Sequence, residues 1–210
     1  ADVVAAYIGT APVNLIRGYA DKDLVNMPVK VTNMSEVQSL VGYSDDWETF
    51  TLGSAFAEHF DNTVGNVGPI YIVNVLDPAV HKSAQKTTKA LTFTDGKAEF
   101  ESDKIILDTF AIADKAEGVD YALSYSMAKH TVTVTLLKET DGAELSATFD
   151  TVDTSKVQVA ETQSRLLRGA VETYRLEVGR IPTAEEGLAV LYTPPADERA
   201  KARWRGPYLD

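Results

Sequence analysis

The sequence predicts an α+β protein built from three successive parts. Residues 1–78 alternate short apolar runs with amphipathic helix patterns, which predicts an α/β layer. Residues 79–157 are rich in Thr, Val, Phe and Asp and contain Asp-Gly turn signals, which predict an antiparallel β-barrel or sandwich. Residues 159–210 show an apolar stripe at helical spacing, which predicts an α-helix followed by a short second helix and a loop.

Short apolar runs bounded by turn residues predict three strands in the first part, over residues 3–8, 28–32 and 70–76. Two helices are predicted among them. Asn33 or Ser35 is expected to cap the first helix, and Gly42 to end it. Apolar residues at helical spacing place the second helix over about residues 47–61. Strands separated by helices imply some parallel pairing, with 70–76 as a central strand.

Two Asp-Gly pairs define the second part. Asp95-Gly96 and Asp141-Gly142 each lie between strand-like runs, and a type I′ hairpin turn needs the positive φ that these residues tolerate. Residues 131–136 alternate Thr with apolar side chains, so one face of that strand should be solvated. We therefore expect residues 79–158 to form an inserted β-domain between the segment 1–78 and the segment 159–210.

The third part is expected to start near Val159. Its predicted helix carries five apolar residues on one face: Leu167, Ala170, Val171, Tyr174 and Val178. This stripe is the candidate assembly or packing site of the chain. It could pack onto the chain's own loop, or onto another helix in an assembly, and both can hold because a helix has two sides.

Turn residues end that helix and begin a second one. Gly179 suits a left-handed cap, and Pro182 prevents the first helix from continuing. Thr183–Glu186 matches a capping box, which predicts a short second helix up to Leu191. Residues 197–210 are expected to be loop-like.

Basic residues change type abruptly near residue 158. Residues 1–158 hold eleven Lys and one Arg against 23 acidic residues, a net charge of −11. Residues 159–210 hold one Lys and seven Arg against eight acidic residues, a net charge of zero. This step suggests two unrelated pieces joined in one chain, either as a natural fusion or by design. The acidic first part disfavours nucleic-acid binding through a basic face.

Composition removes other classes of function. The chain has no Cys, which excludes disulfides, thiolate chemistry and Cys-rich zinc sites. No apolar run approaches the roughly 20 residues that span a bilayer, so we predict no membrane span in this chain.

Catalytic groups are sparse. The histidines lack the spacing of metal ligands. A half-buried structural role is favoured for His59, which lies on a predicted helix near Phe60, while His81 lies in a linker and His130 precedes a strand. Ser124, Ser126 and His130 could be imagined as part of a triad, but the nucleophile-elbow motif is missing. Residues 65–68 could hold phosphate but lack the Lys and Ser/Thr of a phosphate loop, so a tight turn is favoured.

Two acidic groups also invite a functional interpretation. Asp45, Asp46 and Glu48 could hold a cation, although acids matching a helix dipole explain them more simply. Glu99 and Glu101 would share one face of a strand, where a solvated surface is the better interpretation. We therefore predict no catalytic, cofactor or metal site, and no enzyme activity.

Residues 1–158 resemble contractile tail sheath proteins of bacteriophages and prophages. The resemblance is carried by Tyr7–Pro12, Val29–Val37 and Gly68–Val75, followed by a β-domain where that family has a variable one. It implies a structural protein of the virion tail or the bacterial cytoplasm that associates with itself or with other tail subunits. The large C-terminal domain of the family is not expected after residue 158.

Residues 159–210 resemble the major pseudopilin of the type II secretion system. The matching stretches are Tyr174–Leu188, Pro194-Pro195 and Trp204–Leu209. The resemblance implies a periplasmic role in protein secretion and assembly with other pseudopilus subunits. It does not extend to that family's calcium loop, so no calcium site is expected.

These observations favour a structural protein without cofactors. The main hypothesis is a fragment of a sheath subunit joined to a pseudopilin-like segment. The alternative is a pseudopilin fragment for which the sheath-like part is a carrier. An enzyme or binding module without a recognisable site is a third and weaker option.

Overall fold

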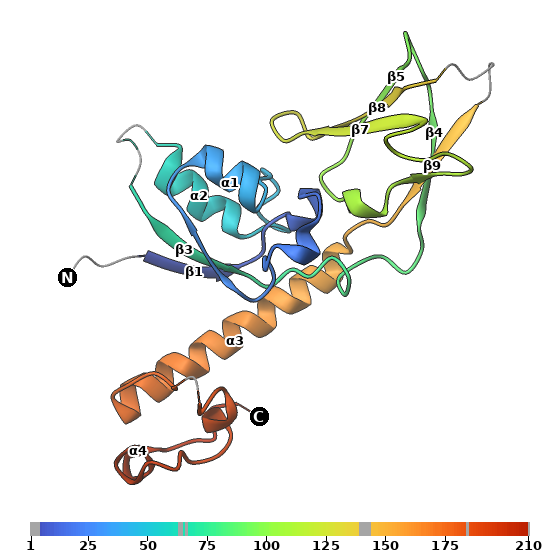
Figure 1. The fold of residues 1–210 in the computed structure, drawn as a ribbon. Coiled ribbons are helices and arrows are strands. Elements are labelled where there is room, and N and C mark those ends of the chain that lie inside the picture. The colour runs from blue at the N-terminus through green and yellow to red at the C-terminus, as the bar shows by residue number, and fades with distance from the viewer. Residues whose placement is uncertain (1–4, 63–64, 66, 139–143, 184, 210) are drawn as a thin grey trace. The chain divides into compact units, whose positions relative to one another are not determined.

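The computed structural model describes residues 5–62, 65, 67–138, 144–183 and 185–209 (Figure 1). It divides the chain into two compact units, which we call unit 1 (residues 1–158) and unit 2 (residues 159–210). The long helix α3 (Thr154–Val178) begins in unit 1 and ends in unit 2. The α+β class predicted from the sequence is confirmed.

The first part of unit 1 is a three-stranded sheet with helices on one face (Figure 1). Its strands are β1 (Ala5–Gly9), β2 (Pro28–Val31) and β3 (Ile70–Asn74). β3 is central, parallel to β1 and antiparallel to β2, so the predicted central strand and partial parallel pairing are confirmed. Single 3₁₀ turns at Val13–Leu15 and Tyr19–Asp21 follow β1.

The two helices of this part are α1 (Met34–Leu40) and α2 (Leu52–Phe60). Asn33 caps α1 because its side chain accepts the Glu36 N–H at 2.9 Å, while the Glu36 carboxylate accepts the Thr32 N–H at 2.8 Å. Gly42 follows α1 with a φ of +82°, the left-handed conformation that the sequence predicts there.

The predicted start of α2 near residue 47 is wrong by about one turn. The Asp46 carboxylate accepts the Thr49 N–H at 3.2 Å, which holds this segment in a separate turn. The Thr10 hydroxyl then accepts the Thr51 N–H at 2.9 Å and donates to the Thr49 carbonyl at 2.6 Å. These bonds tie residues 49–51 to the end of β1, so the helix can begin only at Leu52.

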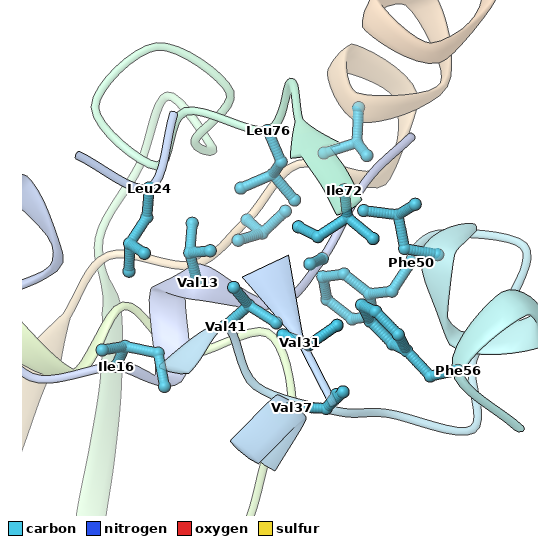
Figure 2. Close-up of a cluster of buried hydrophobic side chains, with 14 of the residues drawn as sticks. Val13, Ile16, Leu24, Val31, Val37, Val41, Phe50, Phe56, Ile72 and Leu76 are labelled. Atoms are coloured by element: carbon cyan, nitrogen blue, oxygen red, sulfur yellow. The ribbon is translucent and has the colours of Figure 1, made fainter. Parts of the chain in front are cut away.

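The core of this part is a cluster of buried hydrophobic side chains (Figure 2). It is lined by residues from the sheet, both helices and the connecting turns, including Val13, Val31, Val37, Phe50, Phe56 and Ile72. Ile106 and Val152 of the β-rich part also enter this core, and Leu15 packs in the core of the β-rich part. Each part of unit 1 therefore contributes residues to the core of the other part.

The second part of unit 1 consists of two three-stranded antiparallel sheets. One has the order β4 (Thr87–Leu91), β9 (Leu145–Phe149), β6 (Ala111–Ile112). The other has the order β5 (Lys97–Glu101), β8 (Thr131–Leu136), β7 (Tyr121–Ser126). A 3₁₀ turn, Leu107–Thr109, precedes β6. Both sheets contribute to one hydrophobic core, and no closed barrel forms among the described residues.

The predicted hairpin around Asp95-Gly96 is only half correct. Both residues have positive φ, +50° and +74°, as a type I′ turn needs. The flanking strands, however, do not pair with each other beyond a single bridge between Thr94 and Lys97. β4 instead pairs with β9, and β5 pairs with β8. In this arrangement Leu91 of β4 and Ala98 of β5 pack in the shared core from different sheets.

The strand pairing predicted for the second hairpin is also wrong. Asp141-Gly142 lies outside the described residues. Its flanking strands β8 and β9 belong to different sheets and do not pair with each other. β8 alternates buried Val132 and Val134 with half-buried Thr side chains, which confirms its predicted alternation.

Unit 2 comprises most of α3, a 3₁₀ turn at Ala189–Leu191 and the helix α4 (Glu198–Arg203) (Figure 1). α3 begins five residues before the predicted start, because the Asp153 carboxylate accepts the N–H groups of Ser155 and Lys156 at 3.0 and 3.3 Å. No helix in the described part of the chain is long and apolar enough to cross a membrane.

Two further predictions in unit 2 are wrong. The expected second helix is reduced to the 3₁₀ turn, because Gly187 has a φ of +56° and interrupts any regular helix. Ala184 of its capping box lies outside the described residues. The expected loop 197–210 instead contains α4, which begins where the Asp197 carboxylate accepts the Ala200 N–H at 2.8 Å.

Candidate assembly site

The five residues of the predicted stripe lie together on one face of α3. Ala170, Tyr174 and Val178 are buried, and Leu167 and Val171 are half-buried. They pack against residues that come later in the chain: Val190, Leu191, Ala200, Trp204, Tyr208 and Leu209. We call this cluster the unit 2 core. The stripe is therefore engaged by the chain's own loop, while its role in assembly stays a prediction.

Three aromatic rings close one side of the unit 2 core. The Tyr208 ring meets Tyr174 and Trp204 edge to face, with ring centroids 5.8 and 5.7 Å apart. The Trp204 indole N–H donates to the Val190 carbonyl at 2.8 Å, and the Tyr208 hydroxyl donates to the Glu177 carboxylate at 2.6 Å. These contacts fasten the last residues of unit 2 to α3 and to the 3₁₀ turn.

An ion pair fixes the loop that leaves α3. Both terminal nitrogens of Arg180 donate to the Glu186 carboxylate, at 2.6 and 2.7 Å. The same carboxylate accepts the Thr183 N–H at 3.0 Å, and the Thr183 hydroxyl accepts the Glu186 N–H at 3.2 Å. The hydrogen bonds from Arg180, and next the one from the Thr183 N–H, lower the pKa of Glu186 to about 2.

Tyr174 carries the one unusual polar group of the unit 2 core. Its side chain is fully buried, and its hydroxyl has no hydrogen-bond partner among the described residues. Burial raises the pKa of this phenol, so it stays neutral. The charge of Arg180 opposes this effect without cancelling it. Because the buried hydroxyl has no hydrogen-bond partner among the described residues, we expect the Tyr174 ring to contribute more stability than its oxygen.

A second face of α3, beside the stripe, was not identified from the sequence. Val159, Leu166 and Leu176 are 57, 63 and 76% exposed. The place where a Gly169 Cβ would lie has no neighbouring atom within 4 Å. Spacings of three and seven residues between these four positions were the signal available in the sequence. The more hydrophobic stripe beside it masked that signal.

Each of the three histidines has a hydrogen-bond partner within the chain. His59 is half-buried, with Nε2 at 2.7 Å from the Tyr7 hydroxyl and Nδ1 at 2.7 Å from the Val67 carbonyl. His81 Nδ1 accepts the Asp77 N–H at 2.9 Å, and burial lowers its pKa. His130 Nε2 lies 2.8 Å from the Tyr43 carbonyl.

The other candidate groups are dispersed. Ser124 lies opposite Thr133 in the sheet and is exposed. Burial opposes ionisation of Asp46, but hydrogen bonds from Lys104 and Thr49 outweigh it and lower the pKa of that carboxyl. Lys104 Nζ lies 2.6 Å from the Asp46 carboxylate. Asp46 is thus engaged in an ion pair.

The carboxylates of β5 are also surface groups. Glu99 and Glu101 are exposed, as a solvated face requires, and Glu99 accepts the Thr133 hydroxyl at 3.2 Å. Gly65 has a φ of +95°, which suits a turn, and Asn66 lies outside the described residues. Within the described part of the chain, no group of three His, Cys, Asp or Glu residues could hold a metal ion.

Comparison with known proteins supports one of the two resemblances. Residues 147–210 match the family model of the type II secretion system (T2SS), protein G. The match covers all of unit 2 and the last residues of unit 1. No curated protein and no solved structure matches the chain. Nothing in the comparisons supports the resemblance of residues 1–158 to phage tail sheath proteins, a place in a virion, or the fusion of two unrelated pieces, so these stay predictions from the sequence.

Proposed function

We propose that the chain is a structural, non-enzymatic protein whose unit 2 serves protein secretion as a pseudopilin-type assembly segment. The observation that carries this proposal is the family match over residues 147–210, which includes the helix, the aromatic cluster and the Arg180–Glu186 pair. Similarity to a pseudopilin family implies assembly with other pseudopilus subunits. A periplasmic location of unit 2 belongs to the same proposal.

The packing of unit 2 suits this role. The unit 2 core occupies one face of α3 and is complete without another chain, because the loop after Gly179 folds back over the stripe. A neighbouring face of the same helix stays exposed at Leu166 and Leu176. A segment with one self-satisfied face and one open face can join an assembly without unfolding. Unit 1 would then act as a carrier with its own core.

The test is binding to pseudopilus subunits in solution. The chain contains two Trp residues, Trp47 in unit 1 and Trp204 in unit 2, so their indole N–H signals in nuclear magnetic resonance report on one unit each. We expect purified minor pseudopilins to shift or broaden the Trp204 signal and to leave Trp47 unchanged. The Tyr174→Ala variant, which lacks the centre of the unit 2 core, is the matched control and should not bind.

Two results would contradict the proposal. One is an unchanged Trp204 signal with the subunits at about 0.5 mM, where complexes with a Kd near 1 mM are still partly formed. The other is a response confined to Trp47, which would transfer the binding function to unit 1.

A further inference from the structure

A second stripe runs along α3 beside the buried one. Its members alternate in steps of three and four residues, all within unit 2: Val159, Thr162, Leu166, Gly169, Thr173 and Leu176. This alternation is the heptad pattern of positions a and d that lines the seam of a coiled coil. We call these six residues the outer seam.

The apolar side chains of the outer seam are exposed in the fold of unit 2. Leu166 and Leu176 are 63 and 76% exposed, and neither belongs to the unit 2 core. Gly169, at the middle of the seam, leaves open space around its Cα. Isolated exposed leucines are ordinary. Here, however, the exposed leucines recur at heptad spacing along one helix, and charged residues, Arg165 and Glu172, lie beside them.

We propose that the outer seam binds the outer seam of a second copy of this chain, with the two α3 helices antiparallel. In an antiparallel seam each a position faces a d position of the other helix. This places Val159 against Leu176 of the second copy, Thr162 against Thr173, and Leu166 against Gly169. Large residues then meet small ones at the centre, where the two Leu166 side chains fill the spaces that Gly169 leaves.

The charges beside the seam select the second copy and the antiparallel direction. Arg165 and Glu172 occupy the flanking g positions, with side chains 72 and 53% exposed. In the antiparallel pairing, Arg165 of each copy faces Glu172 of the other, which gives two complementary contacts by symmetry. A parallel pairing would instead bring Glu172 against Glu177 of the other copy, and like charges there oppose association.

Existing contacts of these two charges do not prevent the pairing. Arg165 lies 3.0 Å from Glu161, and Glu172 lies 2.9 Å from Arg175, both along the same helix. The Glu172–Arg175 pair is exposed and contributes little stability. Arg165 is itself 72% exposed, although the Glu161 side chain is only 12% exposed, so both charges remain accessible to a second copy. The seam spans fewer than three heptads and has Thr and Gly in its centre. The dimer is therefore weak and concentration-dependent, at the small end of specific interfaces.

This inference goes beyond the proposed function and requires only the surface of α3, but both use the face at Leu166 and Leu176, so a second copy and a pseudopilus subunit compete for it. The first experiment is sedimentation equilibrium of the full chain from about 10 μM to about 1 mM, the range in which a weak dimer forms. Arg165→Glu or Glu172→Arg alone should raise the dimer Kd at least about tenfold, and the two together should restore it. Arg168→Glu, on the face away from the seam, is the matched control.

The second experiment determines the direction of the helices. The chain has no Cys, so single cysteines can be introduced without background. A mixture of the Thr162→Cys and Thr173→Cys variants should form a disulfide-linked dimer on mild oxidation, and Thr173→Cys alone should not. In the antiparallel register, the two copies of position 173 are about 16 Å apart along the helix axis, beyond the reach of a disulfide.

Three outcomes would overturn the inference. A monomer at every concentration would exclude the dimer. Efficient crosslinking of Thr173→Cys to itself would indicate a parallel pairing. Failure of the combined charge exchange to restore association, with helicity unchanged by circular dichroism, would remove Arg165 and Glu172 from the interface.

Discussion

Replacing Tyr174 by Ala should unfold unit 2 while unit 1 stays folded. Tyr174 is fully buried at the centre of the unit 2 core, where its ring contacts Tyr208. Truncating a buried aromatic residue to Ala costs about 3–5 kcal/mol. A core of this size rarely supplies more than about 3–5 kcal/mol in total, so the substitution removes most of the stability of unit 2.

Replacing Tyr174 by Phe should leave unit 2 folded. The substitution removes only the hydroxyl, which is buried without a hydrogen-bond partner among the described residues. Removal of an unsatisfied polar group is neutral or stabilising, so the free energy of unfolding should change by less than about 1 kcal/mol or should rise. The pair of variants thus separates the contribution of the ring from that of its oxygen.

Hydrogen exchange of the two indole N–H groups measures the effect in each unit. The Trp204 N–H is bonded to the Val190 carbonyl, so it is protected only while unit 2 is folded. In Tyr174→Ala we expect Trp204 to lose its protection and Trp47 to keep its signal. Retained protection of Trp204 would refute the reasoning. Equal losses in Tyr174→Phe and Tyr174→Ala would show that the hydroxyl, and not the ring, stabilises unit 2.

Three further predictions concern single interactions. The pKa of Glu186 is about 2 in the folded unit against an ordinary 4.5, so its pair with Arg180 stabilises unit 2 above about pH 4.5 and this stabilisation is lost as the pH falls towards 2. In Arg180→Gln the protection of the Trp204 N–H should therefore depend less on acid pH, and a dependence as steep as that of the wild type would contradict the prediction. Asn74→Leu should lower the unfolding free energy of unit 1 by about 4 kcal/mol or more in urea titrations, because the buried Asn74 amide makes hydrogen bonds to four backbone groups. A loss below about 1 kcal/mol would show that water replaces the amide. Asn33→Ala should cost unit 1 about 1 kcal/mol in the same assay, whereas Asn33→Ser should recover most of it, and equal losses would argue against the cap of α1.

Local signals in the sequence predicted local structure well. Asn33 and Gly42 define α1 as expected, because caps and left-handed turns depend on a few neighbouring residues. The apolar stripe around Tyr174 was found for the same reason, since its five residues lie within four turns of one helix. The starts of α2 and α3 were misplaced because Thr10 and Asp153, which lie outside the periodic pattern, set them.

The strand partners in the β-rich part of unit 1 could not be predicted from the sequence. The Asp95-Gly96 turn formed as expected, yet its flanking strands joined different sheets, because their partners β9 and β8 lie far along the chain. Turn chemistry sets the backbone conformation of two residues and does not choose the neighbours of a strand. α4 was missed because it is only six residues long, too short for a periodic apolar pattern, and begins at the cap made by Asp197.

The strand order of unit 1 has a consequence for the time course of folding. β1 pairs with β3 across 65 residues, from Ala5 to Ile70, and β4 pairs with β9 across 54 residues, from Leu91 to Leu145. Chain closure over such distances slows folding, whereas contacts within one helix and its adjoining loop form rapidly. A chain emerging from the ribosome must therefore hold β4 unpaired until nearly all of unit 1 has been made. Unit 2, although synthesised last, needs only local contacts to fold, so unit 1 should set the slow phase of the whole protein.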